Sequence, residues 1–371
     1  MLPRRLVFHI PTLTGGGAER VFVLMANALA ARGHHVTLFT WNAAGPNAAL
    51  RSDAVHLVDL SIPVSGDGFG KPRTLQGLWR SARFYRRQRP DAVFSGPEFA
   101  NLVTAAALVL AGSQARFFPS FHAAASIPSN DFGSKLAARL AGLVAARATR
   151  LIAVSAGIGR DLAARGVPQE KIAVIHNPLP PGIGAGALRS YPWQAELEAL
   201  GQGPVIATAG RLTPVKDHKT LLAAFARLRA VRPARLVVFG DGPLRAELVA
   251  EAGRLGIAGS TLFPGYVNDP AACYGVADLF VLSSVSEGFG NVLIEAMAAG
   301  VPVVSTDAAH GPREILQDGA LGRLVPVGDA AALADAMGQT LDAPLPAETL
   351  RARAADFDIE TIADAYEALL A

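Results

Sequence analysis

This sequence of 371 residues has little cysteine, little charge and no long apolar run. Its single cysteine, Cys273, excludes a disulfide framework and a cysteine-rich metal site. The longest candidate for a spanning helix, residues 99–111, is interrupted by Asn101 and is shorter than the roughly 18 apolar residues required. His9 and Pro11 interrupt the first apolar stretch, so a signal peptide is not expected.

Apolar residues, in contrast, are abundant: 51% of the chain is hydrophobic and only 18% is charged. This composition excludes a disordered chain, and the length predicts two domains at roughly 100–200 residues each. Residues 1–180 contain 20 Lys+Arg and 9 Asp+Glu, a net charge of +11, whereas residues 181–371 contain 14 and 22, a net charge of −8. The two halves are therefore expected to have different partners, the first of them anionic.

Short apolar segments alternate with helical patterns along the chain, which is typical of doubly wound α/β folds with parallel sheets. Strands are expected at 6–10, 36–40, 92–95, 116–120, 151–155, 174–176, 205–209, 235–239, 279–282 and 302–305. Helices are expected at 18–32, 99–111, 135–149, 220–229, 244–255, 292–299 and 359–370. The predicted domains are 1–178 and 179–356, the latter beginning with a Pro- and Gly-rich linker over 179–204. A final helical segment, 357–371, could pack on either domain.

Ligands of doubly wound folds bind where strands end and helices begin, so these loops are the candidate sites. In the first, Gly15, Gly16 and Gly17 precede Glu19 and a predicted helix. Glycines let a backbone approach a ligand, and a helix N-terminus attracts anions. Neither the dinucleotide fingerprint nor the P-loop is satisfied, so a plain tight turn is an equal alternative.

Two loops of the second half follow predicted strands. Arg211 and Lys216 lie in one loop, where an arginine fork and a lysine point charge suit a diphosphate. The alternative is a pair of solvated cations. The Gly-Asp-Gly-Pro turn at 240–243 is interpreted as structural.

The most informative segment is 283–295, SSVSEGFGNVLIE. Glu287 precedes a predicted helix whose N-terminal amides would point toward a phosphate. These amides belong to Phe289, Gly290, Asn291 and Val292. Glu295 lies inside the same apolar helix, where a carboxylate is rarely found unless it is paired or has a function. From this position it could reach a nucleotide ribose. The alternative is that Glu287 is only an acid near the helix N-terminus, favoured by the helix dipole, and that Glu295 is a solvated helical residue.

Taken together, these motifs resemble the retaining glycosyltransferases of family 4, which have the GT-B fold. The resemblance covers nearly the whole chain and rests on residues 16–19, 33–34, 154–155, 176–178, 210–212 with Lys216, 240–243, and the pair Glu287 and Glu295. The segment 311–316 is similar to the branch that builds bacterial surface glycans on lipid carriers. The fold implied is two Rossmann-like domains facing each other across a cleft, the first binding the acceptor and the second the nucleotide-sugar donor.

The resemblance also implies roles for residues of the donor domain. Arg211 and Lys216 would bind the donor diphosphate and stabilise charge on the departing nucleotide. Glu287 would touch hydroxyl groups of the donor sugar, and Glu295 would bind the ribose. The backbone amides near Glu287 would come from Phe289, Gly290, Asn291 and Val292.

In the first domain, the resemblance implies that Gly16 and Gly17 approach the diphosphate and the acceptor, and that His122 lies near the transferred sugar. The implied reaction moves a sugar from a nucleotide donor, UDP by default, to a hydroxyl of a lipid-linked glycan or polysaccharide precursor, with retained configuration. No metal or other cofactor is expected, because fixed cations and helix amides would neutralise the diphosphate. The Asp-x-Asp string at 356–358 is interpreted as a chance match.

Residues 79–89 interleave aromatic rings with arginines. The arginines are Arg80, Arg83, Arg86, Arg87 and Arg89. As a helix, this segment suits an anionic membrane surface, which predicts a cytoplasmic protein held peripherally at the inner face of the membrane. The alternative is a solvated basic face whose rings point into the core. No nucleic-acid-binding motif accompanies the positive charge.

Two other functions are compatible with these residues. One is a nucleotide-sugar epimerase of GT-B architecture, and the other is a non-catalytic nucleotide-sugar-binding protein. The product distinguishes them: a transferase makes a glycoside, an epimerase alters the donor, and a binding protein does neither.

Overall fold

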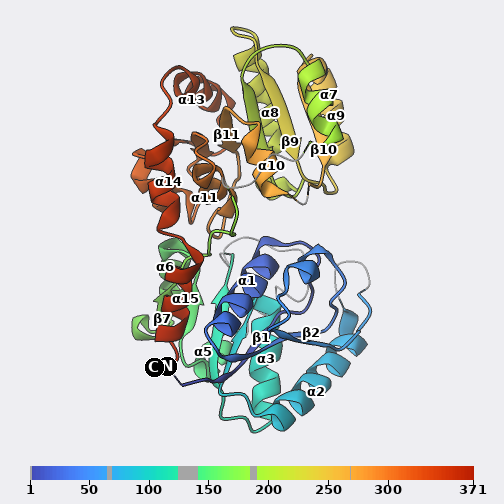
Figure 1. The fold of residues 1–371 in the computed structure, drawn as a ribbon, viewed down its shortest axis with the longest axis vertical. Helices are drawn as coiled ribbons and strands as arrows, with labels where there is room; N and C mark the ends of the chain where they lie inside the picture. Colours follow the sequence, from blue (N-terminus) through green and yellow to red (C-terminus); the bar gives the residue numbers. More distant parts are fainter. Residues whose placement is uncertain (1, 65–68, 124–140, 184–189, 268) are drawn as a thin grey trace. The chain divides into compact units, whose positions relative to one another are not determined.

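The computed structural model describes residues 2–64, 69–123, 141–183, 190–267 and 269–371 (Figure 1). The chain divides into two compact units. The first comprises Met1–Pro178 together with Ile359–Ala371, and the second comprises Leu179–Asp358. Each unit is built around one all-parallel sheet, of seven strands in the first and six in the second. The predicted fold class, two doubly wound α/β domains, is confirmed.

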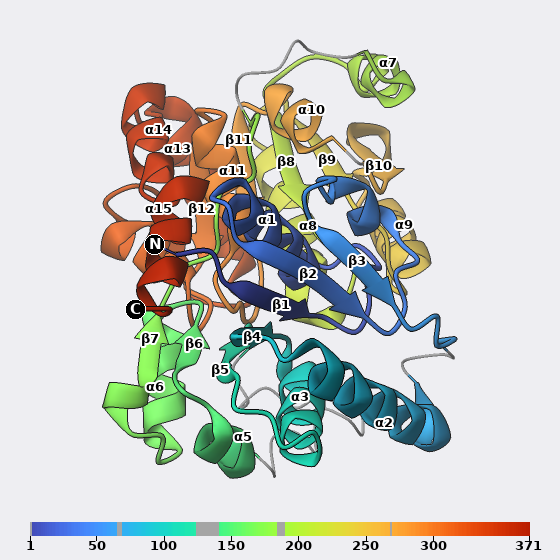
Figure 2. The same cartoon turned by 60° about the horizontal axis from the view of Figure 1, so that its bottom comes forward.

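The sheet of the first unit has the order β3-β2-β1-β4-β5-β6-β7, and β1 to β3 lie side by side in Figure 2. The strands are β1 (Arg5–His9), β2 (His35–Thr40), β3 (His56–Asp59), β4 (Ala92–Ser95), β5 (Arg116–Phe121), β6 (Leu151–Ala153) and β7 (Ile172–Val174). After β1 the chain adds β2 and then β3 on one side of it, and then returns to add β4 on the other side of β1. This reversal creates a topological switch point between β1 and β4, where doubly wound folds bind ligands.

Helices connect the strands of the first unit. They are α1 (Gly17–Ala31), α2 (Gly70–Gln88), α3 (Glu98–Leu110), α5 (Ala141–Arg147), α6 (Ala156–Ala164) and α15 (Ile359–Ala368), with short 3₁₀ turns at Pro46–Leu50 and Gln169–Lys171. The predicted helix at 135–149 is represented by α5, and its residues 135–140 lie outside the described residues. None of the helices in the described part of the chain is both long and apolar enough to cross a membrane.

The last helix, α15, packs on the first unit. The ring of Tyr366 lies 5.2 Å from that of Phe94 and 6.3 Å from that of Phe8, in the core beneath the sheet. Arg32, at the end of α1, forms ion pairs of 2.7 Å with both Glu360 and Asp364. An apolar contact and a charged one therefore hold the end of the chain to the unit in which the chain begins.

The sheet of the second unit has the order β10-β9-β8-β11-β12-β13, which places its switch point between β8 and β11. Its strands are β8 (Val205–Ala209), β9 (Arg235–Phe239), β10 (Thr261–Gly265), β11 (Leu279–Leu282), β12 (Val303–Thr306) and β13 (Arg323–Val325). Its helices are α7 (Pro192–Ala199), α8 (His218–Arg229), α9 (Arg245–Arg254), α10 (Pro270–Gly275), α11 (Asn291–Ala298), α12 (Pro312–Ile315), α13 (Ala330–Asp342) and α14 (Ala347–Ala355). Short 3₁₀ turns lie at Pro214–Lys216, Ala258–Ser260 and Gln317–Gly319.

The structure differs from the sequence prediction at both ends of the second unit. The segment predicted as a linker, 179–204, contains α7, because Trp193 is buried and packs edge-on against Phe239 at 5.0 Å. The final segment was expected from residue 357, but Phe357 belongs to the second unit. Its ring packs against Phe289 at 5.3 Å, so the crossing to the first unit follows Asp358.

Candidate functional site

Two predicted site residues meet at the switch point of the second unit. Lys216 lies in the loop after β8 and Glu287 in the loop after β11, and their side chains form an ion pair of 2.6 Å between Nζ and Oε1. Ser284 Oγ donates to the same carboxylate oxygen, also at 2.6 Å. The side chains are only 23% and 10% exposed, so this pair is shielded from solvent on most sides.

Backbone contacts fix the two loops to each other. The hydroxyl of Ser283 donates to the carbonyl of Lys216 at 2.9 Å, and the amide of Val285 donates to the carbonyl of Val215 at 2.8 Å. Asp217, in the left-handed region at φ +43°, ends the turn and caps α8 through a hydrogen bond from the Thr220 amide. The ion pair therefore lies on a rigid support at the ends of two central strands.

Arg211 precedes this turn, and its side chain is exposed. Within the described residues, no hydrogen bond or ion pair joins its side chain to Lys216 or Glu287, so only the lysine and the glutamate are in direct contact. The neighbouring turn supports the backbone here: a Cβ on Gly240 would lie 1.9 Å from the carbonyl oxygen of Gly210. The Gly-Asp-Gly-Pro turn thus has a packing role, as predicted from its sequence.

The backbone amides predicted to face a phosphate lie at the start of α11. Gly290 caps the helix in the left-handed conformation, at φ +104°, and Asn291 and Val292 form its first turn. Phe289 is buried against Phe357, so its side chain supports the loop. The first turn of a helix carries partial positive charge, so this end of α11 suits an anionic group.

Glu295 lies inside α11 and is 2% exposed. The hydroxyl of Tyr274, on α10, donates to its Oε2 at 2.7 Å. The alternative of a solvated helical glutamate is therefore wrong. Tyr274 was missed in the sequence because it lies within a helix before β11, not in a loop that follows a strand.

In the first unit, Glu19 organises the glycine loop. Its carboxylate accepts from the backbone amides of Gly15 at 2.8 Å and Gly16 at 3.0 Å. It also accepts from the hydroxyls of Thr12 at 2.7 Å and Thr14 at 3.0 Å and from the Asn47 amide at 3.2 Å. Gly17 begins α1. A plain tight turn does not require a buried carboxylate that accepts five hydrogen bonds, so this loop is more than such a turn.

His122 follows β5. Its Nε2 lies 3.0 Å from Ser120 Oγ, and its backbone amide donates to Glu98 Oε1 at 3.3 Å. Burial lowers the pKa of His122 to about 4, so the imidazole is neutral at physiological pH. Burial also raises the pKa of the Glu98 carboxyl. Glu98 follows β4 at the switch point of this unit, and the same loop rule could have identified it.

Two other polar side chains, on β1 and after α14, have structural partners. His9 is fully buried; its Nδ1 lies 2.8 Å from the Tyr85 hydroxyl and 2.7 Å from that of Thr104, and burial lowers its pKa to about 3. Asp356, in the Asp-x-Asp string, pairs with Arg353 at 2.8 Å. In the ranges that the structure describes, no group of three or more His, Cys, Asp or Glu side chains is arranged to hold a metal ion.

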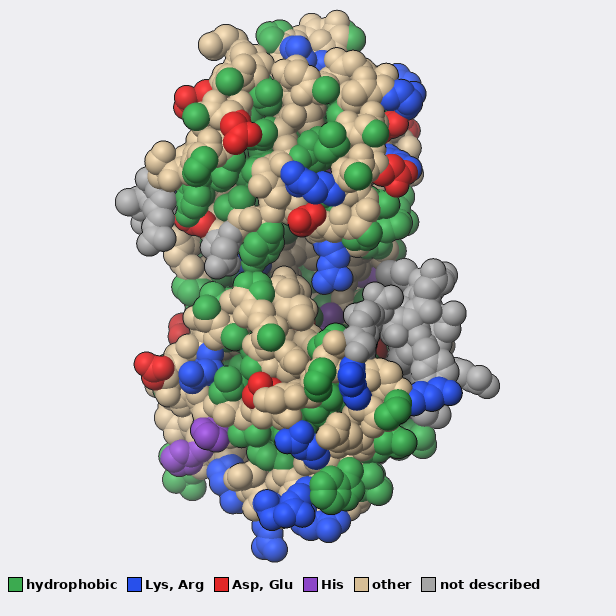
Figure 3. All heavy atoms as spheres, turned by 90° about the vertical axis from the view of Figure 1, so that its right-hand side faces the viewer, with side chains coloured by type: hydrophobic (Ala, Val, Ile, Leu, Met, Phe, Trp, Pro, Cys, Tyr) green, Lys and Arg blue, Asp and Glu red, His purple; other side chains and the backbone are tan. Residues whose placement is uncertain are grey.

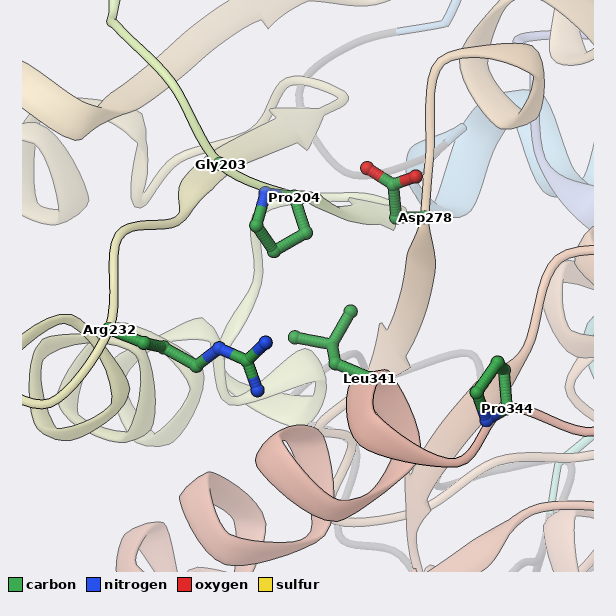
Figure 4. A pocket seen from close by; sticks show the side chains of 6 residues that line it. All are labelled: Gly203, Pro204, Arg232, Asp278, Leu341 and Pro344. Atoms are coloured by element: carbon green, nitrogen blue, oxygen red, sulfur yellow. The ribbon is translucent and has the colours of Figure 1, made fainter.

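A surface cavity of about 440 Å³ lies elsewhere on the second unit (Figure 4). Gly203 and Pro204, before β8, and Asp278, before β11, line it together with Arg232, Leu341 and Pro344. It is thus at the amino edge of the sheet, opposite the edge that carries Lys216 and Glu287. This cavity is not part of the candidate site.

Known proteins resemble both units. The family described as Glycosyltransferase Family 4 matches residues 15–182, and the family described as Glycosyl transferases group 1 matches residues 192–357. The chain is 30% identical to the lipopolysaccharide core biosynthesis glycosyltransferase LpsE of Rhizobium meliloti, over 98% of each chain.

Two further similarities are more distant or partial. The chain is 37% identical to an N-acetylgalactosaminyltransferase of Campylobacter jejuni that acts on a diphospho-undecaprenol glycan, over 36% of this chain and 38% of that protein. The crystal structure of Anabaena HepE with UDP-glucose superposes with a TM-score of 0.80 at 22% identity, covering 99% of each chain.

The family models match both units, and the similarity to LpsE covers 98% of each chain. Lys216 and Glu287, two of the residues expected from the resemblance, lie at the switch point of the second unit, and the solved structure shares the fold. The chain belongs to glycosyltransferase family 4 and is a glycosyltransferase with the GT-B fold.

Proposed function

We propose that this enzyme transfers a sugar from a UDP-sugar to a hydroxyl group of a lipid-linked glycan, with retention of anomeric configuration. The observation that carries the proposal is the shielded Lys216–Glu287 pair, fixed at the switch point of the second unit beside the N-terminus of α11. HepE, solved with UDP-glucose, supports the donor class, and the relatives from Rhizobium meliloti and Campylobacter jejuni support the acceptor class.

The proposed roles follow from charge. Breaking the bond between the anomeric carbon and the diphosphate oxygen leaves negative charge on the diphosphate, which Lys216, Arg211 and the first turn of α11 stabilise. Glu287 accepts hydrogen bonds from hydroxyls of the sugar, while Glu295 binds the ribose. The acceptor oxygen attacks from the same face that the diphosphate leaves, and its proton passes to the departing phosphate oxygen.

The first unit supplies the acceptor side of the proposal. Gly16 and Gly17 present backbone without side chains, on a loop that Glu19 holds in place. His122 is neutral, so it can donate or accept a hydrogen bond with a sugar hydroxyl without adding charge. No metal is assigned a role, because the second unit supplies its own positive groups.

A transfer assay tests the proposal. The full chain is incubated with UDP-sugars and GDP-sugars and a short lipid-linked acceptor, and products are identified by mass spectrometry. We expect a glycoside and free UDP, formed equally well in excess EDTA. An epimerised donor with no glycoside would show that the protein is an epimerase, and a need for added divalent metal would exclude the metal-independent mechanism.

We further propose that the first unit binds an anionic membrane surface through α2. Leu75, Trp79, Arg83 and Arg87 recur every four residues and are all exposed, so they form one stripe along the helix. Figure 3 shows Lys and Arg side chains gathered at the end of the first unit where Figure 1 places α2, with apolar side chains among them.

The rings of the segment 79–89 do not share one environment. Tyr85 is buried and Phe84 stacks on Phe39 at 4.3 Å, as the core alternative predicted. Trp79 is 62% exposed, and the Arg83 guanidinium lies 5.7 Å from its ring. Aromatic and basic side chains on one exposed face suit the interface of an anionic bilayer.

Replacing Arg83 and Arg87 with alanine is expected to weaken binding to anionic liposomes by roughly 30-fold, since each arginine contributes about 1 kcal/mol near such a surface. Co-sedimentation at two salt concentrations measures the effect. The matched control removes Arg227 and Arg229, at the end of α8 in the second unit, and should bind as the wild type does. Equal binding of the wild type to neutral and anionic liposomes would contradict the proposal.

A further inference from the structure

The contact between Tyr274 and Glu295 joins two helices inside the second unit. Tyr274 lies on α10 and is 1% exposed, and Glu295 lies on α11 and is 2% exposed. The tyrosine hydroxyl donates to Glu295 Oε2 at 2.7 Å. Neither the motifs of the sequence nor the roles proposed above assign a function to this hydroxyl.

Because both side chains are buried, this hydrogen bond matters for the free energy of the charged Glu295 carboxylate. A carboxylate removed from water is costly unless polar partners stabilise its charged form. The thiol of Cys273 stays protonated and adds no second negative charge near this carboxylate, because burial and the carboxylates of Asp269 and Glu295 raise its pKa to about 12. The Tyr274 hydroxyl, in contrast, is a strong donor in direct contact, and a hydrogen bond to a charged group contributes more than one between neutral groups.

The tyrosine is itself held rigidly. Its ring packs against Phe280 of β11 at 5.4 Å, and Asp269 caps α10 through a hydrogen bond from the Ala272 amide. A tyrosine side chain has only two rotatable bonds, so a packed ring places its hydroxyl at one point. A hydrogen bond from that point favours one plane of the Glu295 carboxylate, since the last torsion of a glutamate side chain has only a broad preference of its own.

A ribose diol is sensitive to this plane. Its two adjacent hydroxyls donate to a carboxylate only when the lone pairs of the oxygens are aimed at them. A carboxylate offers about four lone-pair positions, and the tyrosine occupies one of them. Fixing the plane before the nucleotide arrives removes the cost of ordering the side chain on binding.

We propose that Tyr274 is a positioning residue that aims the Glu295 carboxylate at the ribose hydroxyls and so makes the donor site selective for ribonucleotides. This inference rests on the proposed ribose contact of Glu295. It adds a second residue, on a separate helix, to the recognition of the nucleoside diphosphate.

The test compares two nucleotides with two proteins. Binding of UDP and of 2′,3′-dideoxy-UDP to the full-length wild type and to Tyr274→Phe is measured by calorimetry. Phenylalanine keeps the packing against Phe280 and removes only the hydroxyl. We expect the Kd for UDP to rise about tenfold and the Kd for the dideoxy nucleotide to change less than twofold, because only UDP uses the oriented carboxylate. Tyr266→Phe, an exposed tyrosine of the same unit, is the matched control and should change neither Kd.

A double-mutant cycle separates positioning from a general effect on stability. In a Glu295→Ala background, Tyr274→Phe should have no further effect on UDP binding, because the carboxylate that it positions is gone. An equal loss of affinity for both nucleotides, or an unchanged preference for UDP in Tyr274→Phe, would overturn the inference. Failure of the wild type to bind UDP would instead contradict the proposed function, so the two failures are distinguishable.

Discussion

Replacing Glu287 with alanine is expected to lower kcat for sugar transfer by at least about 100-fold while the second unit stays folded. The carboxylate contacts Lys216 and Ser284 at the switch point, so its loss removes both the proposed sugar contact and the group that orients the lysine. Loss of one preorganised polar group in an active site costs about 100- to 1000-fold in kcat. Initial rates at saturating donor, together with the melting temperature, measure the two parts of the prediction.

The control for this variant is Glu251→Ala, which removes a carboxylate of the same unit paired with Arg254 on the surface of α9. It should leave kcat unchanged. Glu287→Gln should be nearly as inactive as the alanine variant, because the amide cannot pair with the ammonium of Lys216. Turnover within threefold of the wild type in either Glu287 variant would remove this residue from the mechanism.

Replacing Lys216 with alanine is expected to lower kcat by about 100- to 1000-fold, with a smaller effect on donor affinity. The proposed ligand of its ammonium is the diphosphate, on which charge grows as the glycosidic bond breaks, so the interaction is strongest in the transition state. Rates at saturating donor and the Kd for the donor separate these effects. A variant that weakens donor binding and leaves kcat unchanged would show that Lys216 acts only in binding.

Lys219→Ala is the matched control for Lys216. Lys219 lies three residues further along, is exposed, and pairs with Glu247 on the surface. Its removal should leave both kcat and donor affinity unchanged. Because Lys216 and Glu287 form one pair, their effects should not add: the double alanine variant should be about as slow as the slower single variant.

All the central strands were predicted from sequence, whereas three of the four edge strands were not. The three strands absent from the prediction, β3, β10 and β13, all lie at an edge of a sheet. A central parallel strand is buried on both faces and forms a continuous apolar run, whereas an edge strand is partly exposed and carries polar residues. In β3 the ends are His56 and Asp59, and β10 contains Pro264.

Some residues of the candidate site were likewise predicted from sequence, and others were not. Lys216, Glu287 and Glu295 were identified because loops that follow central strands, and the helices after them, lie at the carboxyl edge of a sheet. Tyr274 was not, because it lies 21 residues before Glu295 and the two side chains meet only in the folded chain.

Helix α2 shows why composition alone could not decide between a membrane face and a core face. The sequence places aromatic and basic residues next to one another. A helix that faces a membrane and a helix that faces the core can both have this composition. The fold separates them by position on the helix: Tyr85 points into the core, whereas Trp79 lies on the exposed stripe. Which face of a helix is covered depends on its neighbours, and these are set by tertiary structure.

The return of α15 to the first unit has a consequence for synthesis on the ribosome. The second unit is one continuous segment, Leu179–Asp358, and can fold as soon as it emerges. The first unit cannot complete its core until Tyr366 and Leu370 have been translated, after the entire second unit. A nascent chain released before α15 is made therefore has a continuous second unit and a first unit whose core lacks Tyr366 and Leu370, so the apolar surface that α15 covers stays exposed.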